Sequence, residues 1–376
     1  MKRIFLGALA ATLFFSCSKE NDEVSNMTGD KALVNISVTS PETKAATTGA
    51  VPTDVTVANF TVFIITSAGE IGWSAYSATG ADLNGISVNN TAQHVFVVAN
   101  AGNLTTAITS KTQLDGFLAN LNSTTIQGGQ ASARWATGST ASALSFTQDG
   151  SGNFEADASV ELTFIAARIT LKIVNNMYPA YNANAIDGSL VLNRVAVLNA
   201  RGESKLFGTS LIPAAYTAGR KFYTGIDNPS SPDDFAHFPA SGGYTYNSST
   251  QTLLSDAIPA NNFNNTYYYY VFENDATTAD AFPTIITIVG TFDGKNVYYP
   301  VHLAGYEQFS GTVPAGVEFI KRGYSYDITI DLTVDPTKSG GNPGGTDDPT
   351  EPVVNAKIDV TIELKPWIAV PLGKEF

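Results

Sequence analysis

The chain has 376 residues, enough for two ordinary domains that each have a hydrophobic core. Its formal net charge is −13, and it has no cluster of Lys and Arg, which argues against a nucleic-acid-binding surface. Its single cysteine excludes an internal disulfide framework. Charged residues are sparse while Gly and Tyr are plentiful, a profile typical of short strands joined by polar turns, so the expected fold class is all-β.

The N-terminus has the pattern of a secretory signal peptide. After a basic start, the apolar stretch Ile4–Phe15 has twelve residues, which in a helix span about 18 Å, short of the about 30 Å of a bilayer core. We therefore interpret residues 1–16 as a signal peptide. Ser16 directly precedes Cys17, which resembles the lipobox of bacterial lipoproteins and predicts lipid attachment at Cys17. The alternative is a plain signal peptide followed by an incidental cysteine.

The first strand is expected at Leu33–Thr39, where apolar and polar residues alternate. Val34, Ile36 and Val38 fall on one face, as in a half-buried strand. A turn-like stretch follows, in which the basic residue Lys44 stands among small residues that suit proteolysis.

A short helix is expected between the strands of the first half. Apolar residues spaced i, i+3, i+4 and i+7 support it, with Ser110 or Thr112 as the N-cap: Leu114, Phe117, Leu118 and Leu121. The strands expected along the rest of the chain, apart from its end, are Val55–Thr66, Ile86–Val88, His94–Ala99, Ala143–Thr147, Phe154–Ala156, a pair within Ala158–Val174, Leu190–Ala200, Tyr267–Glu273, Thr284–Asp293, Asn296–Leu303 and Ser325–Val334.

Two connecting segments carry further information. Asp149–Asn153 has the composition of a hairpin turn. Its oxygens at alternate positions faintly resemble a calcium loop, but the loop's turn glycine and terminal Glu are out of register, so we favour the turn. The segment from about residue 207 to 263 is too long for a plain loop and is expected to contain local structure.

The end of the chain has the most informative pattern. Residues 335–352 are rich in Gly, Pro, Asp and Thr and are interpreted as a linker. Eleven residues of unbroken alternation follow from position 354 to 364, a strand about 36 Å long. Its apolar residues are Val354, Ala356, Ile358, Val360, Ile362 and Leu364. Pro366 ends the strand, and Trp367 begins a short apolar tail.

Such a strand must bury its apolar face against a sheet. That sheet can belong to its own domain, the usual case for a terminal strand, or to another molecule. The long linker favours another molecule, as does the amphipathic strand Leu33–Thr39 before Lys44. Removing one strand from a sheet opens a groove that a strand from a second chain can fill, which is donor-strand complementation.

Several short motifs follow one another along the chain in a recognisable order. They are Val97–Gly102, Ala167–Ile169, Tyr270–Asp275, Pro283–Ile285, Tyr298–Val301, Ile320–Arg322 and Tyr326–Ile328, followed by the linker and the last strand with Trp367. In these motifs the chain resembles the major fimbrillins of Bacteroidetes, the shaft subunits of type V pili. The resemblance covers nearly the whole chain.

The resemblance implies a mechanism and a fold. A lipoprotein precursor at the outer membrane would be cleaved by a trypsin-like protease between Lys44 and Ala45, and relatives have Arg at the position of Lys44. Cleavage would release the strand carrying Val34, Ile36 and Val38, and the next copy would insert its C-terminal strand.

Implied partners are further copies of the chain and accessory, anchor or tip fimbrial subunits, and the implied location is an extracellular fimbrium. Each domain would be a transthyretin-like β-sandwich, and the expected segments are a propeptide at 17–44, domains at 45–158 and 159–334, the linker at 335–352 and the donor strand at 353–376.

Other function classes find less support. His94, His237 and His302 lie outside metal-ligand spacing of one another, and no Gly-x-Ser-x-Gly motif is present. Glu273 and Asp275 fall at one strand end, where a turn role is more common than a glycosidase pair. We therefore expect no enzyme activity, cofactor, metal or nucleic-acid partner. The alternatives are a monomeric surface lipoprotein that binds glycans or host proteins through tyrosines such as Tyr244, Tyr246 and the run Tyr267–Tyr270, and an accessory or tip adhesin.

Overall fold

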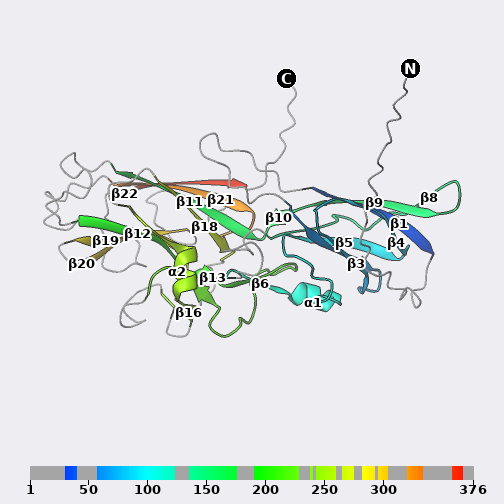
Figure 1. The fold of residues 1–376 in the computed structure, drawn as a ribbon, viewed down its shortest axis with the longest axis horizontal. Helices are drawn as coiled ribbons and strands as arrows, with labels where there is room; N and C mark the ends of the chain where they lie inside the picture. The colour runs from blue at the N-terminus through cyan, green and yellow to red at the C-terminus, as the bar shows by residue number, and fades with distance from the viewer. Residues whose placement is uncertain are drawn as a thin grey trace, which may run out of the picture.

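The structure is a computed structural model of the chain, and its regular secondary structure is almost entirely β-strand, with two short helices among the described residues (Figure 1). It describes residues 30–39, 57–122, 135–175, 190–227, 238–239, 243–259, 265–274, 282–292, 295–303, 320–332 and 358–366. Across these ranges no helix is long and apolar enough to cross a membrane. The same ranges contain no group of three or more His, Cys, Asp or Glu side chains able to hold a metal ion.

The N-terminal sandwich consists of two sheets. The first contains, in spatial order, β4 (Leu83–Asn89), β1 (Lys31–Thr39), β9 (Phe154–Glu161) and β8 (Thr147–Gln148). The second contains β10 (Thr163–Phe164), β7 (Ala136–Ser139), β5 (Ala92–Ala99), β2 (Phe60–Thr66) and β3 (Ile71–Ser77). All seven residues of β2 are buried, including the polar residues Thr61 and Thr66.

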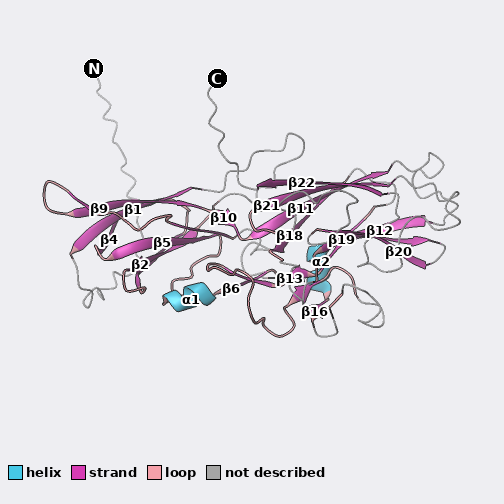
Figure 2. Cartoon of the chain, turned by 180° about the vertical axis from the view of Figure 1, so that it is seen from behind, coloured by secondary structure: helices cyan, strands magenta, loops and turns pink. Residues whose placement is uncertain are grey.

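The C-terminal sandwich also has two main sheets. One contains β18 (Thr266–Phe272), β11 (Ala166–Asn175), β21 (Tyr324–Leu332) and β22 (Ile358–Pro366). The other contains β17 (Ser255–Ala257), β12 (Leu190–Leu198), β19 (Ile285–Phe292) and β20 (Lys295–His302). Figures 1 and 2 show the two sandwiches at opposite ends of the long axis, with β1, β9 and β22 along one long side.

The two sandwiches repeat one arrangement of strands. β1, the first strand of the N-terminal sandwich, pairs antiparallel with β4 and parallel with β9. β11, the first strand of the C-terminal sandwich, pairs antiparallel with β18 and parallel with β21. Beyond β9 and β21 comes an antiparallel edge strand, β8 in one case and β22 in the other. β22 therefore occupies the edge position of its sheet, whereas β1 lies inside its own.

The chain passes from one sandwich to the other without a loop. β9 ends at Glu161, β10 switches to the second sheet, and β11 begins at Ala166. Leu162 and Ile165 are the single residues between these strands, and both side chains are completely buried. The sequence-based boundary between residues 158 and 159 falls inside β9.

Smaller elements lie beside the sandwiches. The segment from 207 to 263 has local structure, as expected, in the form of β15 (Phe222–Tyr223), β16 (Tyr244–Thr245), α2 (Ser248–Leu254) and β17. Ahead of it lie β13 (Ala200–Arg201) and β14 (Glu203–Lys205). β13 pairs with β15, which also pairs with β16.

The helix predicted from Leu114 to Leu121 is shorter than expected. α1 (Lys111–Gly116) begins after the N-cap Ser110, as predicted, but the backbone turns extended at Phe117. Residues Leu118–Asn120 form a strand, β6, which pairs with β14. A distant strand partner therefore overrides the helical spacing of the apolar residues. The strand expected at Ala143–Thr147 is also shorter, because only Thr147 of that range belongs to β8.

The main hydrophobic core is continuous between the two sandwiches. One cluster of buried side chains contains Ile36 and Phe63 from the N-terminal sandwich and Ile169 and Tyr326 from the C-terminal one. Burial raises the pKa of the Tyr326 hydroxyl to about 12, and its oxygen accepts a hydrogen bond from the Lys321 backbone N–H at 2.9 Å. In the run Tyr267–Tyr270, Tyr267 and Tyr269 are buried, Tyr270 is half-buried and Tyr268 is 41% exposed.

Candidate strand-exchange site

β1 is an interior strand held by two neighbours over most of its length. It pairs with β9 from Ala32 to Thr39 and with β4 from Lys31 to Ile36. Ala32, Val34 and Ile36 point into the core with at most 2% of their surface exposed. We call the space that β1 fills between β4 and β9 the β1 slot. Without β1, the slot would expose two strand edges and an apolar floor.

The outer face of β1 is fixed by side-chain hydrogen bonds. The Asn35 amide nitrogen donates to Asp157 Oδ1 of β9 at 2.9 Å, and its oxygen accepts from the Gly85 N–H of β4 at 2.9 Å. The β1–β4 register shifts between Val34 and Ile36, and Gly85 has a φ of +67°. The left-handed backbone at Gly85 suits glycine, and Asn35 supplies the hydrogen-bond acceptor for its N–H group.

β22 is an edge strand of its own molecule. All nine of its residues pair antiparallel with β21, from Ile358 opposite Leu332 to Pro366 opposite Tyr324. Among the described strands, β21 is its one partner. The single chain therefore provides an internal partner for the segment that the sequence suggested would pair outside its molecule. β22 also overlaps the strand expected from the alternation, because it contains Ile358, Val360, Ile362 and Leu364.

The structure thus places part of the predicted site. Val34 and Ile36 are buried and Val38 is half-buried on the inner face of β1. The predicted lipidation, cleavage and remaining donor positions lie outside the described residues: Cys17, Lys44, Ala45, Val354, Ala356 and Trp367.

A second set of contacts joins the two sandwiches. β6 lies next to α1, and it pairs antiparallel with β14, which follows the C-terminal sandwich strand β12. The Tyr223 hydroxyl donates to Asn120 Oδ1 at 2.9 Å, and the Leu121 N–H donates to the Gly202 carbonyl at 2.9 Å. We call this region, from residue 117 to 121 and from 200 to 207, the junction.

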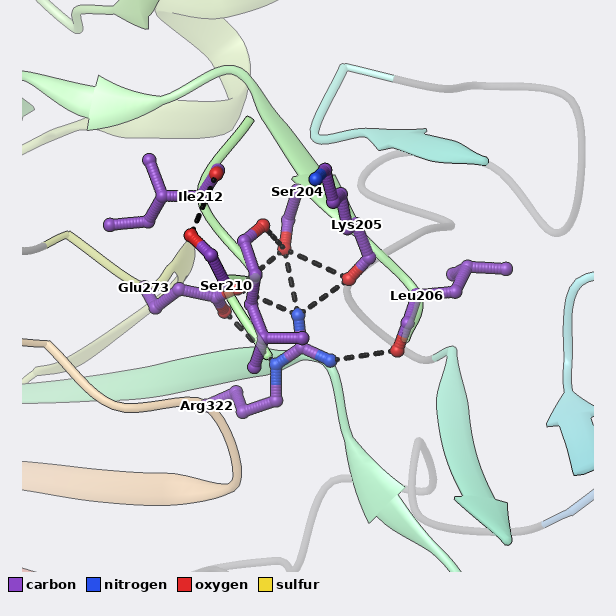
Figure 3. Close-up of polar contacts among 8 residues, drawn as sticks. Ser204, Lys205, Leu206, Ser210, Ile212, Glu273 and Arg322 are labelled. Carbon is purple, nitrogen blue, oxygen red and sulfur yellow. Dashed lines mark hydrogen bonds and ion pairs between the residues drawn. The ribbon is translucent and has the colours of Figure 1, made fainter. Parts of the chain in front are cut away.

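A buried ion pair lies beside the junction (Figure 3). The Arg322 guanidinium donates to both carboxylate oxygens of Glu273, at 2.7 and 3.1 Å. The two side chains are only 13% and 7% exposed. Arg322 also donates to the backbone carbonyls of Lys205 and Leu206 at 2.6 and 3.1 Å, and to Ser204 Oγ at 2.9 Å. Glu273 directly follows β18, and Arg322 lies just before β21. The pair therefore connects the end of β14 with the end of β18 and the start of β21.

A neighbouring network extends these contacts into the C-terminal sandwich. Arg201 Nε donates to Asn274 Oδ1 at 2.9 Å, and its guanidinium carbon lies 4.4 Å from the centre of the Phe222 ring. The Asn274 amide nitrogen donates to the Phe282 carbonyl at 2.7 Å and to Thr284 Oγ1 at 3.0 Å. These contacts connect the ends of β13, β18 and β19 with one another.

A match over the C-terminal part of the sequence shows the family of the chain. A family model described as "FimA-like major fimbrial subunit protein, C-terminal domain" matches residues 166–367, more than half of the chain. The chain belongs to the FimA-like fimbrial subunit family. Fimbrial subunits of this kind form appendages on the cell surface, and the family is typically non-enzymatic.

Solved structures share the fold of this FimA-like subunit. A suspected cell adhesion protein from Bacteroides eggerthii superposes with a TM-score of 0.67 and 24% identity, over 91% of this chain and 98% of that chain. A fimbrilin from Porphyromonas gingivalis superposes with a TM-score of 0.62 and 19% identity, over 90% and 98%. No curated protein sequence matches the chain.

Sequence reasoning missed the role of the charged residues in this FimA-like subunit. The sequence indicates a turn role for Glu273 and places Arg322 only within a family motif. The sequence does contain one indication of this ion pair: two opposite charges stand at expected strand ends, in a chain with only 15% charged residues. Their meeting depends on tertiary structure, since 48 residues separate them in the sequence.

The Asp149 turn is predicted to lose its hydrogen bonds in acid. Asp149 Oδ1 accepts from the backbone N–H groups of Ser151 and Asn153, both at 2.8 Å, and its other oxygen accepts from the Asn153 amide. The Asn153 side chain contributes most to lowering the pKa of Asp149 below its ordinary value. A lowered pKa stabilises the turn above the ordinary carboxyl pKa of about 4, and this contribution is lost as the pH falls through the lower folded value.

NMR titration of the Asp149 carboxyl group tests this prediction. Its midpoint should lie below that of an unstructured Asp, and Asn153→Ala should move it back toward the ordinary value. An unchanged midpoint in Asn153→Ala would contradict the assignment of the main cause.

Proposed function

We propose that this chain is the shaft subunit of a surface fimbria and that it polymerises by protease-triggered donor-strand exchange. Its C-terminal strand would fill the β1 slot of a neighbouring copy after β1 has been released. The observation that carries the proposal is the unequal placement of two terminal strands. β1 lies between two partners inside its sheet, whereas β22 lies at a sheet edge with one.

The position of β1 suits release and replacement. It precedes every other strand that the structure describes, so it can leave without threading the chain through another described loop. Its departure would expose the edges of β4 and β9 and uncover the floor on which Val34 and Ile36 lie. Unpaired strand edges beside apolar surface favour the addition of another strand.

The position of β22 suits donation. It is the last of the described strands, and release from β21 would leave the remaining ladder of β21 with β11 intact. In the docked state, β22 covers the edge of its own sheet. The proposed exchange therefore begins from a docked strand, whose separation from β21 is a required step.

Donor and slot belong to different sandwiches, which determines the geometry of assembly. The slot is in the N-terminal sandwich and the donor in the C-terminal one. An interface between two different surfaces is heterologous and, when it does not close into a ring, builds an open filament. Head-to-tail growth along the long axis fits the extended arrangement of the two sandwiches (Figure 2).

Three further parts of the proposal rest on the sequence. Cys17 would carry the lipid that anchors the precursor to the outer membrane, and cleavage between Lys44 and Ala45 by a trypsin-like protease would release β1. The two domains, expected at 45–158 and 159–334 from the sequence, would meet between β9 and β11 rather than inside β9, and accessory, anchor or tip subunits would complete the fimbrium.

Limited trypsin digestion of the purified full chain tests the trigger. We expect a new N-terminus at Ala45 and high-mass ladders that resist mild heating. Lys44→Gln should leave the chain monomeric, because this variant has no basic residue at the cleavage position. Lys44→Arg is the matched control and should assemble like the unmodified chain. Ladders of equal length from Lys44→Gln, with residues 17–44 still attached, would refute cleavage as the trigger.

A further inference from the structure

The inner face of the β1 slot has one place for a small residue. Four residues of β1 face inward: Ala32, Val34, Ile36 and Val38. Ala32 lies in register with Val88 of β4 and Phe154 of β9, and 2% of its surface is exposed. Two larger neighbours flank it, so a larger side chain there would overpack the core.

The C-terminal segment also has one small residue on its apolar face. Ala356 is followed by Ile358, Val360 and Ile362 at alternate positions. A strand keeps its apolar face inward only when its register changes by an even number of residues. The possible registers in the slot therefore differ by two residues.

We propose that the incoming strand enters the β1 slot with Ala356 at the place of Ala32. This inference rests on the strand exchange proposed above and assumes that the donor keeps the direction of β1. Ile358, Val360 and Ile362 then take the places of Val34, Ile36 and Val38, so that each large inward residue is replaced by one of similar size. Residues 355–363 fill the slot.

The neighbouring registers fit less well. A shift by two residues in one direction puts Ile358 at the Ala32 place, which overpacks it. The opposite shift puts Val354 at that place and Ala356 at the Val34 place, which leaves a cavity. A further shift in that direction would put Pro352 at the Ala32 place, inside the sheet, where its missing N–H would break the ladder.

In the proposed register, the incoming strand makes different polar contacts on its outer face from those that β1 makes. Asp359 takes the place of Asn35, and a carboxylate there can accept the Gly85 N–H as the Asn35 oxygen does. It cannot donate to Asp157, which receives the Asn35 amide hydrogen bond in the single chain. The slot is therefore better matched to β1 than to the incoming strand on this face, which favours retention of β1 until cleavage.

Cysteine cross-linking in the assembled polymer tests the register. Leu33 pairs with Ser87 of β4, and the proposed register puts Lys357 at the place of Leu33. In a Cys17→Ser chain, Ser87→Cys with Lys357→Cys should therefore form disulfide-linked ladders after trypsin treatment. Ser87→Cys with Asn355→Cys and Ser87→Cys with Asp359→Cys report the two neighbouring registers.

The outcomes separate the register from the exchange itself. Ladders in either neighbouring pair, or polymers without cross-links in any pair, would overturn the register and leave polymerisation standing. Failure of the parent Cys17→Ser chain to polymerise would instead reject the proposed function.

A pair of substitutions provides a second test. Ala356→Leu puts a large residue at the small place and should slow polymerisation at least tenfold. Ala369→Leu is the matched control, because residue 369 lies beyond β22 and outside the slot, and this variant should assemble at the parent rate. The reverse pattern would overturn the proposal.

Discussion

A chain without residues 353–376 is expected to fold and to be cleaved, but not to polymerise. β22 has one strand partner, so its loss leaves the β11–β21 ladder and the rest of both sandwiches in place. Fully burying a large aliphatic side chain contributes roughly 1.5 to 3 kcal/mol, and the deletion removes all of the donor residues that would fill the slot. We expect circular dichroism of the uncleaved variant to match the full chain, and size-exclusion chromatography after trypsin to show no high-mass species.

A shorter deletion provides the matched control. Removing residues 368–376 keeps β22 and Trp367, so polymers should form at close to the normal yield. Long polymers from the chain that lacks 353–376 would contradict donor-strand exchange through this segment. Failure of both deletions to assemble would point instead to a role for the last nine residues.

The Arg322→Ala variant is expected to lose about 3–5 kcal/mol of unfolding free energy, the usual cost of removing one partner from a buried ion pair. The substitution leaves the Glu273 carboxylate buried and removes the donors to the Lys205 and Leu206 carbonyls. Urea denaturation monitored by tryptophan fluorescence measures the change. Because the Arg322 side chain also contacts the junction, proteolysis between the sandwiches should become faster.

Two further variants separate the ion pair from general surface effects. Arg322→Met combined with Glu273→Leu removes both charges and should recover part of the loss, since no buried charge remains unpaired. Lys111→Ala breaks the ion pair with Asp115 on α1, where the two side chains are 28% and 43% exposed. That exposed pair should contribute no more than about 0.5 kcal/mol. Equal losses from Arg322→Ala and Lys111→Ala would contradict the importance of burial.

Local alternation predicted most of the longer strands, and the two terminal strands best, but β3 (Ile71–Ser77) and β7 (Ala136–Ser139) were missed. The apolar positions of Leu33–Thr39 face inward in β1, and the alternating segment from 354 coincides with β22 from Ile358. These patterns are visible in sequence because a strand with one buried face repeats every two residues.

Contacts between distant segments could not be predicted in the same way. The helical spacing that ends at Leu121 indicated a helix, but Leu118–Asn120 pairs with β14, more than 80 residues away. Alternation could not predict the strand partner of β22 either. It indicates which face of a strand is apolar, but not which sheet covers that face. The Arg322–Glu273 pair depends on the same long-range folding, because each residue lies in a strand-end segment with an ordinary turn-like composition.

The loop-free passage from β9 through β10 to β11 has a mechanical consequence for a filament built from such subunits. β9 borders the slot that would hold one neighbour, and β11 pairs with the strand that docks the donor segment. Tension along the filament would therefore run through the covalent backbone between the sandwiches, and the junction would bear little of it. The junction would instead resist bending. Weakening it should therefore make the fibres more flexible, while the force needed to break them stays the same.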